Sequence, residues 1–435
     1  MRTHSALVLL VALAVGPPAV AQAGAGTWSL LDASPFHGYR FEDGSFLDPE
    51  TGWIVNPDGE IWGTTDGGTS WTFLDQVPAY LRATVFVNEQ HGFVGTLNQS
   101  NVLYETTDGA TFTDITDRID GPVPSGICGL WAVNEDVIYG VGWYAGPAHF
   151  VKTTDGGQTW TSRSMSEYVG SLVDVYFWDE ERGIAVGGTD GAGANSRAVV
   201  LLTEDGGDTW SVRYTSPIRE SGEWSWKITF PTPTTGYVSI EGNGDPAKVL
   251  KTTDAGVTWS VRTIPGSNDL QGLGFITENV GWASGRGMTS VTTDGGTTWS
   301  PLALDGSINR FEFFGDTLGY AMGHRIYTLA RPTTTDAEGT PSASVAAITA
   351  SFPNPFATAT TIQYETDRAG DVTLEVHDVL GRRVATLAQG FRPPGPHEAT
   401  WDGRAEDGRV LASGVYLVRL TAGDRIATHR VTLLR

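Results

Sequence analysis

The chain has 435 residues, of which 40% are hydrophobic, so it is long enough for two or three domains with cores of their own. Its 28 Lys and Arg against 50 Asp and Glu give a formal net charge of -22, which disfavours binding to nucleic-acid phosphates and docking on anionic lipid. The single cysteine, Cys128, excludes an internal disulfide and a metal site built from several cysteines. We therefore expect no nucleic-acid partner, no bound metal and no cofactor.

The first residues follow the pattern of a secretory signal peptide. Residues 1–4 carry positive charge, residues 7–15 form an apolar run, and Ala19-Val20-Ala21 supplies the small residues of a cleavage site. The apolar run is too short to span a bilayer as a helix, and no later stretch is apolar enough to do so. We predict a signal peptide over residues 1–21 and a mature chain without a transmembrane segment; an uncleaved anchor is the alternative.

One turn motif recurs six times between residues 64 and 299. Its general form is Thr-Thr-Asp-Gly-Gly-x-Thr-Trp, and its aspartates are 42, 47, 50, 49 and 40 residues apart. Asp-Gly and Gly-Gly favour a tight hairpin turn, in which the carboxylate accepts backbone N–H groups while the final aromatic residue packs between neighbouring units. We interpret as structural the residues Asp66, Asp108, Asp155, Asp205, Asp254, Asp294, Trp71, Trp160, Trp210, Trp259 and Trp299.

A second signature, a glycine followed by an aromatic or β-branched residue, precedes most of these turns, as at Gly52-Trp53 and Gly281-Trp282. Each repeat contains the four short strands of one propeller blade. A seventh unit begins at Ile308 but has no final strand, and Thr27-Trp28 resembles the final strand of the preceding unit. We predict an all-β chain with a seven-bladed β-propeller over residues 25–330, closed by the N-terminal strand; six or eight blades are the alternatives.

The turn motif resembles the Asp-box, or bacterial neuraminidase repeat, of sialidases, sortilin-type receptors and some endoglucanases. Together with the Gly-aromatic strands it is similar to the photosystem II stability and assembly factor family. The resemblance implies a propeller whose aspartate turns lie away from the ligand, and it implies no particular function. The Phe/Tyr-Arg-Ile-Pro motif of sialidases is missing ahead of the first turn, which argues against that activity.

After the repeats, residues 331–349 are rich in Thr, Ala and Ser and are predicted to form a linker. Residues 350–435 then alternate apolar and polar side chains in about seven short segments, which predicts a small Ig-like β-sandwich.

Several pieces of this last region resemble the C-terminal sorting domain of type IX secretion cargo. They are Phe352-Pro353-Asn354-Pro355-Phe356, Gly381-Arg382-Arg383-Val384 and Ser413-Gly414-Val415-Tyr416, while Trp401-Asp402-Gly403-Arg404 resembles the Ig-like domain of flagellar hook-capping proteins. The resemblance implies passage through the periplasm, the type IX machinery as a partner, release or attachment at the outer-membrane surface, and a Bacteroidota-like source.

Loop insertions in the blades are the expected carriers of a ligand site. Clustered aromatic and charged residues suit stacking on a sugar or capture of a peptide, although for any single one of them packing between blades or a solvated charge is the better explanation. The candidate ligand-binding residues are Trp143, Tyr144, Arg219, Glu223, Trp224, Trp226, Arg310 and Glu312. The last two are expected on an innermost strand, where they either line the central channel or belong to a satisfied ion pair.

No spacing of residues selects a catalytic set. We therefore predict a secreted or cell-surface, non-catalytic binding or scaffold module with a glycan or protein ligand. The alternative is a secreted glycan-acting hydrolase, sialidase-like or of another kind, which requires two carboxylates at a hydrolytic separation at one channel mouth. A purely structural surface protein is a third possibility.

Overall fold

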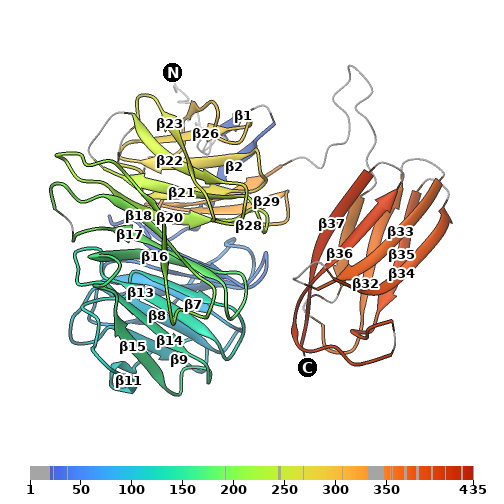
Figure 1. Ribbon diagram of the computed structural model, residues 1–435, viewed down its shortest axis with the longest axis horizontal. Helices are drawn as coiled ribbons and strands as arrows, with labels where there is room; N and C mark the ends of the chain where they lie inside the picture. Colours follow the sequence, from blue (N-terminus) through green and yellow to red (C-terminus); the bar gives the residue numbers. More distant parts are fainter. Residues whose placement is uncertain are drawn as a thin grey trace, which may run out of the picture. The chain divides into compact units, whose positions relative to one another are not determined.

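The computed structural model describes residues 20–331 and 347–434, apart from residues 23, 37, 192, 243–245, 268, 306, 353, 355, 367–369, 379–381, 393, 394, 407, 423 and 424. It separates into two compact units, Met1–Thr333 and Thr334–Arg435 (Figure 1). Most of the predicted signal peptide and linker, and parts of the sorting-domain motifs, lie outside the described residues. Cleavage after residue 21 stays a prediction.

The first unit is a propeller of seven antiparallel sheets. The first strands of the sheets contact one another in a ring that closes between β28 and β3. They are β3 (Asp43–Phe46), β7 (Leu81–Phe86), β12 (Gly129–Ala132), β16 (Ser171–Phe177), β20 (Trp224–Thr229), β24 (Gly272–Phe275) and β28 (Arg310–Phe314).

The remaining strands of each blade follow outward in chain order, except in the seventh blade, whose outer strand β2 comes from the N-terminal part of the chain. The second strands are β4 (Gly52–Val55), β8 (Gly92–Thr96), β13 (Ile138–Gly142), β17 (Gly183–Gly188), β21 (Gly236–Glu241), β25 (Gly281–Gly285) and β29 (Leu318–Met322). The third strands are β5 (Glu60–Thr64), β9 (Leu103–Thr106), β14 (His149–Thr153), β18 (Ala198–Thr203), β22 (Ala247–Thr252), β26 (Met288–Thr292) and β30 (Ile326–Ala330). The fourth strands are β6 (Thr72–Gln76), β10 (Thr113–Asp114), β15 (Trp160–Ser164), β19 (Ser211–Thr215), β23 (Ser260–Ile264), β27 (Ser300–Leu302) and β2 (Gly26–Leu30).

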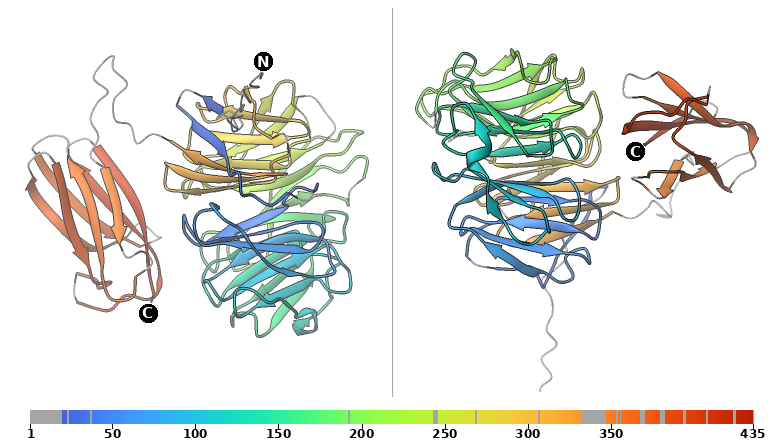
Figure 2. Two further views of the ribbon diagram at one scale, coloured as in Figure 1. Left: turned by 180° about the vertical axis from the view of Figure 1, so that it is seen from behind. Right: turned by 90° about the horizontal axis from the view of Figure 1, so that it is seen from below.

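The ring is closed by the N-terminal strand, as predicted. Strand β2 pairs antiparallel with β30, so that Trp28 lies opposite Leu329 in the seventh blade. Figure 2 shows this blue strand beside the orange strands of the same sheet. The Trp28 side chain is buried and meets the ring of Trp282 edge-on at 5.3 Å. Seven blades and their closure are thereby confirmed.

Two short strands were not predicted. Strand β1 (Val20–Gln22) pairs with β2 outside the seventh blade, and β11 (Ile119–Asp120) adds a parallel strand to β15. A single 3-10 turn, Thr116–Arg118, leads into β11. The described part of the chain holds no helix of the length and apolarity needed to cross a membrane.

The Gly-aromatic signature has a steric cause. In the sixth blade, Phe275 at the end of the first strand lies opposite Gly281 at the start of the second, and a Cβ on Gly281 would come within 2.4 Å of the Phe275 ring. In the preceding blade, Tyr237 directly follows the corresponding glycine. Its ring stacks on the Phe275 ring, with the two ring centroids 3.5 Å apart. The glycine leaves room for the phenylalanine, and the aromatic residue joins one blade to the next.

The six aspartate turns connect third and fourth strands, and each carboxylate is used within its own turn. Asp254 accepts hydrogen bonds from Thr252 Oγ1 at 2.7 Å, Thr258 N at 2.9 Å and Thr258 Oγ1 at 2.6 Å. The other five aspartates likewise accept bonds from the hydroxyl two residues earlier and from backbone N–H groups that follow. Of the terminal tryptophans, Trp160 and Trp210 are buried, while Trp71, Trp259 and Trp299 are half-buried.

Chain direction divides the propeller into two faces. We call "turn face" the side that holds the six aspartate turns, and "loop face" the opposite side, where the first strands begin. The loops from each fourth strand to the next first strand, and from second to third strands, both lie on the loop face because neighbouring strands are antiparallel.

The second unit is a sandwich of seven described strands. One sheet has the order β31 (Ala347–Phe352), β32 (Thr360–Thr366), β35 (Gly395–Trp401), and the other β34 (Arg383–Arg392), β33 (Gly370–His377), β36 (Gly414–Ala422), β37 (Arg425–Leu433). Its core contains Phe356, Tyr364 and Trp401. The Tyr416 hydroxyl donates to the Ala412 carbonyl at 2.9 Å, an arrangement like the tyrosine corner of Ig-type sandwiches. The predicted Ig-like sandwich is confirmed.

Candidate functional site

Five charged residues occur near the loop-face ends of the first strands. They are Asp43 on β3, Arg82 on β7, Asp174 on β16, Lys227 on β20 and Arg310 on β28, and we call them the axial cluster. The first four are 2% exposed or less, whereas the Arg310 side chain keeps 18% of its surface exposed. Charges buried to this degree are rare in proteins unless they are paired or functional.

Bulges in the first strands place two of these cations. The pairing of β7 with β8 skips a residue between Leu81 and Ala83, so Arg82 is the extra residue. The pairing of β20 with β21 shifts between Ser225 and Ile228, which leaves out Trp226 and Lys227. A bulge interrupts the ladder and re-aims a side chain, and bulges are frequent next to functional sites.

Asp43 is the most fully satisfied member of the axial cluster. It accepts a hydrogen bond from Arg310 Nη2 at 3.2 Å and another from the Thr84 backbone N–H at 3.0 Å, and Lys227 Nζ lies 4.0 Å from its Oδ1. Burial acts to raise the pKa of Asp43, but the charges of Arg310 and Lys227 outweigh burial and hold this pKa below its ordinary value. The carboxylate therefore stays ionised and connects its own blade with three others.

A second buried carboxylate, Glu42, precedes β3 in the loop from β2. It accepts hydrogen bonds from Arg40 Nε at 2.9 Å, from the Tyr80 hydroxyl at 2.8 Å and from Asn309 Nδ2 at 3.1 Å. Arg82 Nη1 lies 3.6 Å from it, beyond hydrogen-bond distance. Burial would raise the pKa of Glu42, but the neighbouring arginines hold it below the ordinary value.

Several buried polar atoms of the first strands have no hydrogen-bond partner among the described residues. They include both terminal nitrogens of Arg82, Nζ of Lys227 and Oε2 of Glu312. Burial lowers the pKa of Lys227 to about 8 and raises that of Glu312 to about 8. Below that pH, Glu312 is a neutral acid that can donate a hydrogen bond, and its charged neighbours are Arg310 and Asp43.

An aromatic stack covers part of the axial cluster. The ring centroids of Trp143 and Tyr144 are 5.7 Å apart, and those of Tyr144 and Trp226 are 6.0 Å apart. The guanidinium carbon of Arg82 lies 5.3 Å from the centre of the Trp226 ring. The structure thus brings together three of the predicted aromatic residues, from two blades, over a buried cation.

The other predicted residues divide into two places. Glu223 forms ion pairs with Arg219 Nε at 3.0 Å and Lys248 Nζ at 2.6 Å, and Trp224 next to it packs against glycine backbone. Arg310 and Glu312 lie two residues apart on β28, and both are partly exposed although β28 belongs to the inner ring. The ion pair expected as an alternative exists between Arg310 and Asp43. Cys128 is buried, and the described residues contain no group of three metal-ligating side chains.

The loop face also has exposed apolar residues around the ring. All five lie in loops that lead from a fourth strand to the next first strand: Phe36 is 57% exposed, Tyr39 54%, Tyr80 39%, Val123 45% and Ile218 69%. Exposed apolar residues that stand singly are common on protein surfaces, so these five residues support an interaction surface only together with the aromatic residues near them.

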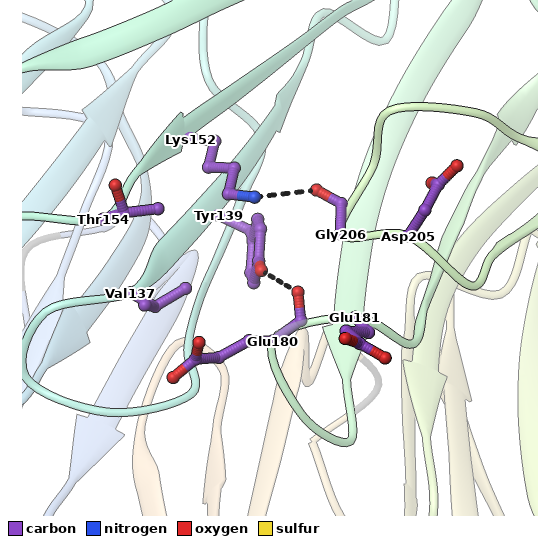
Figure 3. A pocket seen from close by; sticks show the side chains of 8 residues that line it. All are labelled: Val137, Tyr139, Lys152, Thr154, Glu180, Glu181, Asp205 and Gly206. Atoms are coloured by element: carbon purple, nitrogen blue, oxygen red, sulfur yellow. Dashed lines mark hydrogen bonds between the residues drawn. The ribbon is translucent and has the colours of Figure 1, made fainter.

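A pocket of about 320 Å³ lies on the turn face between the third and fourth blades (Figure 3). Two of its polar side chains are engaged within the protein: Lys152 Nζ donates to the Gly206 carbonyl at 3.2 Å, and the Tyr139 hydroxyl donates to the Glu180 carbonyl at 2.7 Å. Lys251 and Tyr237 make the same two bonds, at 3.2 Å and 2.7 Å, between the fifth and sixth blades. Because the same two bonds recur between another pair of adjacent blades, we interpret the arrangement as a structural contact that holds neighbouring blades together.

Two carboxyl groups meet on the loop face. Glu241 shares a hydrogen bond with Asp269, and Gln271 Nε2 donates to Glu241 Oε1 at 2.8 Å. Burial, followed by the charge and hydrogen bond of Asp269, raises the pKa of Glu241 to about 7. Two carboxyl groups in direct contact leave no space for the sugar carbon that a glycosidase places between its carboxyl pair.

The sequence analysis missed Arg82, Lys227, Asp43 and Asp174. A signal was present: each of these charged residues stands three or four positions before a phenylalanine at the end of a first strand or directly after it, namely Phe86, Phe230, Phe46 and Phe177. The bulges that turn Arg82 and Lys227 aside from the regular alternation have no such signal.

Comparison with known proteins supports this architecture. The model of the FlgD Ig-like domain family matches residues 355–425. Photosystem II assembly lipoprotein Ycf48 from Synechocystis sp. is 33% identical over 81 residues, which are 18% of this chain and 20% of that protein, so the match spans about a fifth of the relative.

Two solved structures show the same fold at low identity. The structure "YCF48 bound to D1 peptide" is 18% identical, with a TM-score of 0.53, over 73% of this chain and 99% of the other. An ancestral GH74 enzyme is 15% identical, with a TM-score of 0.50, over 91% of this chain and 59% of the other. The chain is a β-propeller protein followed by a domain similar to the FlgD Ig-like domain. The Asp-box name and the sorting domain stay predictions.

Proposed function

We propose that the propeller is a non-catalytic binding module that takes a segment of another protein on its loop face. The observation that carries the proposal is the joint occurrence there of the Trp143-Tyr144-Trp226 stack, the exposed apolar loop residues and the buried cations of the axial cluster. Aromatic and arginine side chains at the centre of a surface supply most of the binding energy in protein interfaces.

The composition of the face favours a protein ligand over a glycan. Sugars stack on aromatic rings, whereas Val123 and Ile218 are aliphatic and suit apolar side chains of a polypeptide. A propeller of this fold has been solved with a bound peptide, which is a precedent at the level of fold alone. The Glu241–Asp269 pair is in direct contact, so this pair does not supply the separated carboxyl groups that the hydrolase alternative requires.

A selection experiment with matched variants tests this proposal. Random displayed peptides are selected on the immobilised full-length chain, and the selected peptides are then measured against Ile218→Ser and Val212→Ser. Ile218 is 69% exposed on the loop face, and Val212 is 51% exposed on the outer strand β19. We expect Ile218→Ser to weaken binding at least tenfold and Val212→Ser to leave it unchanged. Equal effects, or failure to select any peptide, would contradict the proposal.

We further propose that the signal peptide and the C-terminal domain export the propeller through the periplasm and the type IX machinery. The similarity of residues 355–425 to an Ig-like domain is compatible with this role. Deletion of residues 334–435 in a host with that machinery should retain the propeller inside the cell, as measured by fractionation. Unchanged export of the shortened chain would refute the role of this domain.

A further inference from the structure

The axial cluster has donors without acceptors. Arg82 and Lys227 are 2% and 1% exposed, and neither finds a hydrogen-bond acceptor for its terminal nitrogens among the described residues. A buried cation without an acceptor is strongly unfavourable, so a group from outside the described chain is expected to complete the site.

The carboxylates already present are engaged elsewhere. Asp43 receives bonds from Arg310 and Thr84, and Asp174 Oδ2 accepts the Ile228 backbone N–H at 3.1 Å. Glu42 is occupied by Arg40, Tyr80 and Asn309. Arg82 and Lys227 lie 3.6 Å and 4.0 Å from the nearest of these carboxylate oxygens, which is near enough for attraction but too far for a hydrogen bond.

The net charge of the buried groups indicates the charge of the group that would complete the site. The cations Arg40, Arg82, Lys227 and Arg310 exceed the carboxylates Glu42, Asp43 and Asp174 by one. At pH 6, Glu312 and Glu241 are mainly protonated, because burial raises their pKa values to about 8 and about 7. A carboxylate supplies one negative charge, which offsets this excess.

Access to the site is through Arg310. Its side chain is 18% exposed within the inner ring, and Glu312 two residues further along β28 is also partly exposed. Part of the Arg310 side chain is therefore accessible, while its Nε and Nη2 atoms bind Asp43. We propose that a carboxylate of the bound protein segment enters the centre of the ring and is held by Arg310, with Arg82 and Lys227 behind it.

This inference deepens the proposed function and rests on it. A protonated Glu312 is suited to donate to the same carboxylate, as a neutral acid does in other buried anion sites. The bulges at Arg82 and Lys227 are independent support, because they displace both side chains from the regular strand. The carboxylate is either a chain terminus or a glutamate or aspartate side chain of the partner.

The test uses acid and amide probes that differ in one charge. N-acetyltryptophan and N-acetyltryptophan amide are added to the full-length chain at pH 6, and the thermal midpoint is recorded, since a ligand of the folded state raises it. We expect the acid to raise the midpoint at concentrations at least tenfold lower than the amide requires. Equal shifts, or no shift with either probe, would overturn the inference.

Variants locate the site. Removal of Arg310 alone deprives Asp43 of the cation that is hydrogen-bonded to it, so the test uses the double change Asp43→Asn with Arg310→Gln, which keeps the pair neutral. We expect it to weaken binding of the acid at least tenfold and to leave binding of the amide unchanged. Glu312→Gln, a neutral donor at all pH values, should retain binding. Undiminished binding of the acid by the double variant would refute the assignment.

The pH dependence gives a second readout. Arg310, Asp43, Asp174 and Arg82 surround Lys227, and the first two also face Glu312. Above pH 8 Lys227 loses its charge and Glu312 gains one, so binding of the acid should fall. Glu312→Gln should reduce this fall. A pH-independent affinity between 6 and 9 would count against the inference.

Modified peptides show whether the carboxylate is a chain terminus or an acidic side chain. They also show whether this inference and the proposed function fail together or separately. Selected peptides are compared with a free or amidated terminus, and with glutamate or glutamine inside the sequence. If amidation of the peptide's C-terminus abolishes binding, the bound carboxylate is the chain terminus. If replacement of glutamate by glutamine abolishes binding, the bound carboxylate is a side chain. If peptides bind the loop face equally without any carboxylate, this inference is wrong and the proposed function stands. If no peptide binds, the proposed function is wrong, and the acid probe still decides the carboxylate site.

Discussion

At the scale of single residues, the repeat motifs are explained by contacts that recur from blade to blade. A phenylalanine that ends a first strand covers a glycine, as Phe275 covers Gly281. In the turns, a threonine or serine hydroxyl and backbone N–H groups surround each aspartate, as at Asp254. These roles were predictable because they depend on neighbours close in sequence.

The glycine contact predicts a steric cost. Gly281→Ala places a Cβ 2.4 Å from the Phe275 ring, which cannot move because Tyr237 stacks on its other side. We expect a loss of about 1–3 kcal/mol in the free energy of unfolding, as for other overpacked cores. The control is Gly193→Ala, whose added methyl group has its nearest contact at 3.6 Å. Denaturant unfolding of both variants measures the difference, and equal stabilities would disprove the contact's role.

The aspartate turns predict a dependence of stability on pH. The hydroxyl and N–H groups of Thr258 hold the pKa of Asp254 below its ordinary value. Because the folded pKa is depressed, this carboxylate contributes stability above its unfolded pKa of about 3.9, and that contribution is lost as the pH falls through the folded value. Asp254→Asn does not titrate, so its unfolding free energy should fall less steeply between pH 5 and 2.5. A parallel slope would contradict the assignment.

At the scale of elements, the closing strand and the blade count were predictable, and the bulges were not. The Thr27-Trp28 dipeptide matches the Thr-Trp that ends the repeated turn motif. Strand β2 could therefore be assigned to a blade that lies more than 250 residues away in sequence. The bulges of β7 and β20 depend on how the first strands pack around the propeller axis, and this packing produces no recognisable pattern in the local sequence. The sequence analysis consequently identified Arg310 and Trp226 but missed Arg82 and Lys227.

Closure by β2 makes a prediction about chain order. A circular permutant that begins at residue 32 and carries residues 24–31 after residue 331 restores β2 beside β30 and should keep the native thermal midpoint within a few degrees. Deletion of residues 24–31 removes Trp28 from its contact with Trp282, a loss comparable to truncation of a buried tryptophan, which costs about 3–5 kcal/mol. A deletion variant as stable as the permutant would show that the closing strand contributes little.

At the scale of the whole molecule, the propeller separates two chemically different faces. The turn face consists of turns whose polar groups are satisfied within the repeat. The loop face holds five exposed apolar residues, the aromatic residues Trp143, Tyr144 and Trp226, and cations without acceptors. Length and periodicity predict such an architecture well, whereas the character of a face depends on which residues seven separate loops bring together.

The most direct test of this account is the location of a bound peptide. A peptide selected on the full-length chain is synthesised with a photoreactive group, cross-linked to the chain, and the labelled residues are identified by mass spectrometry. We predict labels in the loop-face segments 36–42, 143–147 and 216–223. Labels confined to the turn-face pocket around Lys152, Glu180 and Gly206 would contradict the assignment of the loop face as the binding surface.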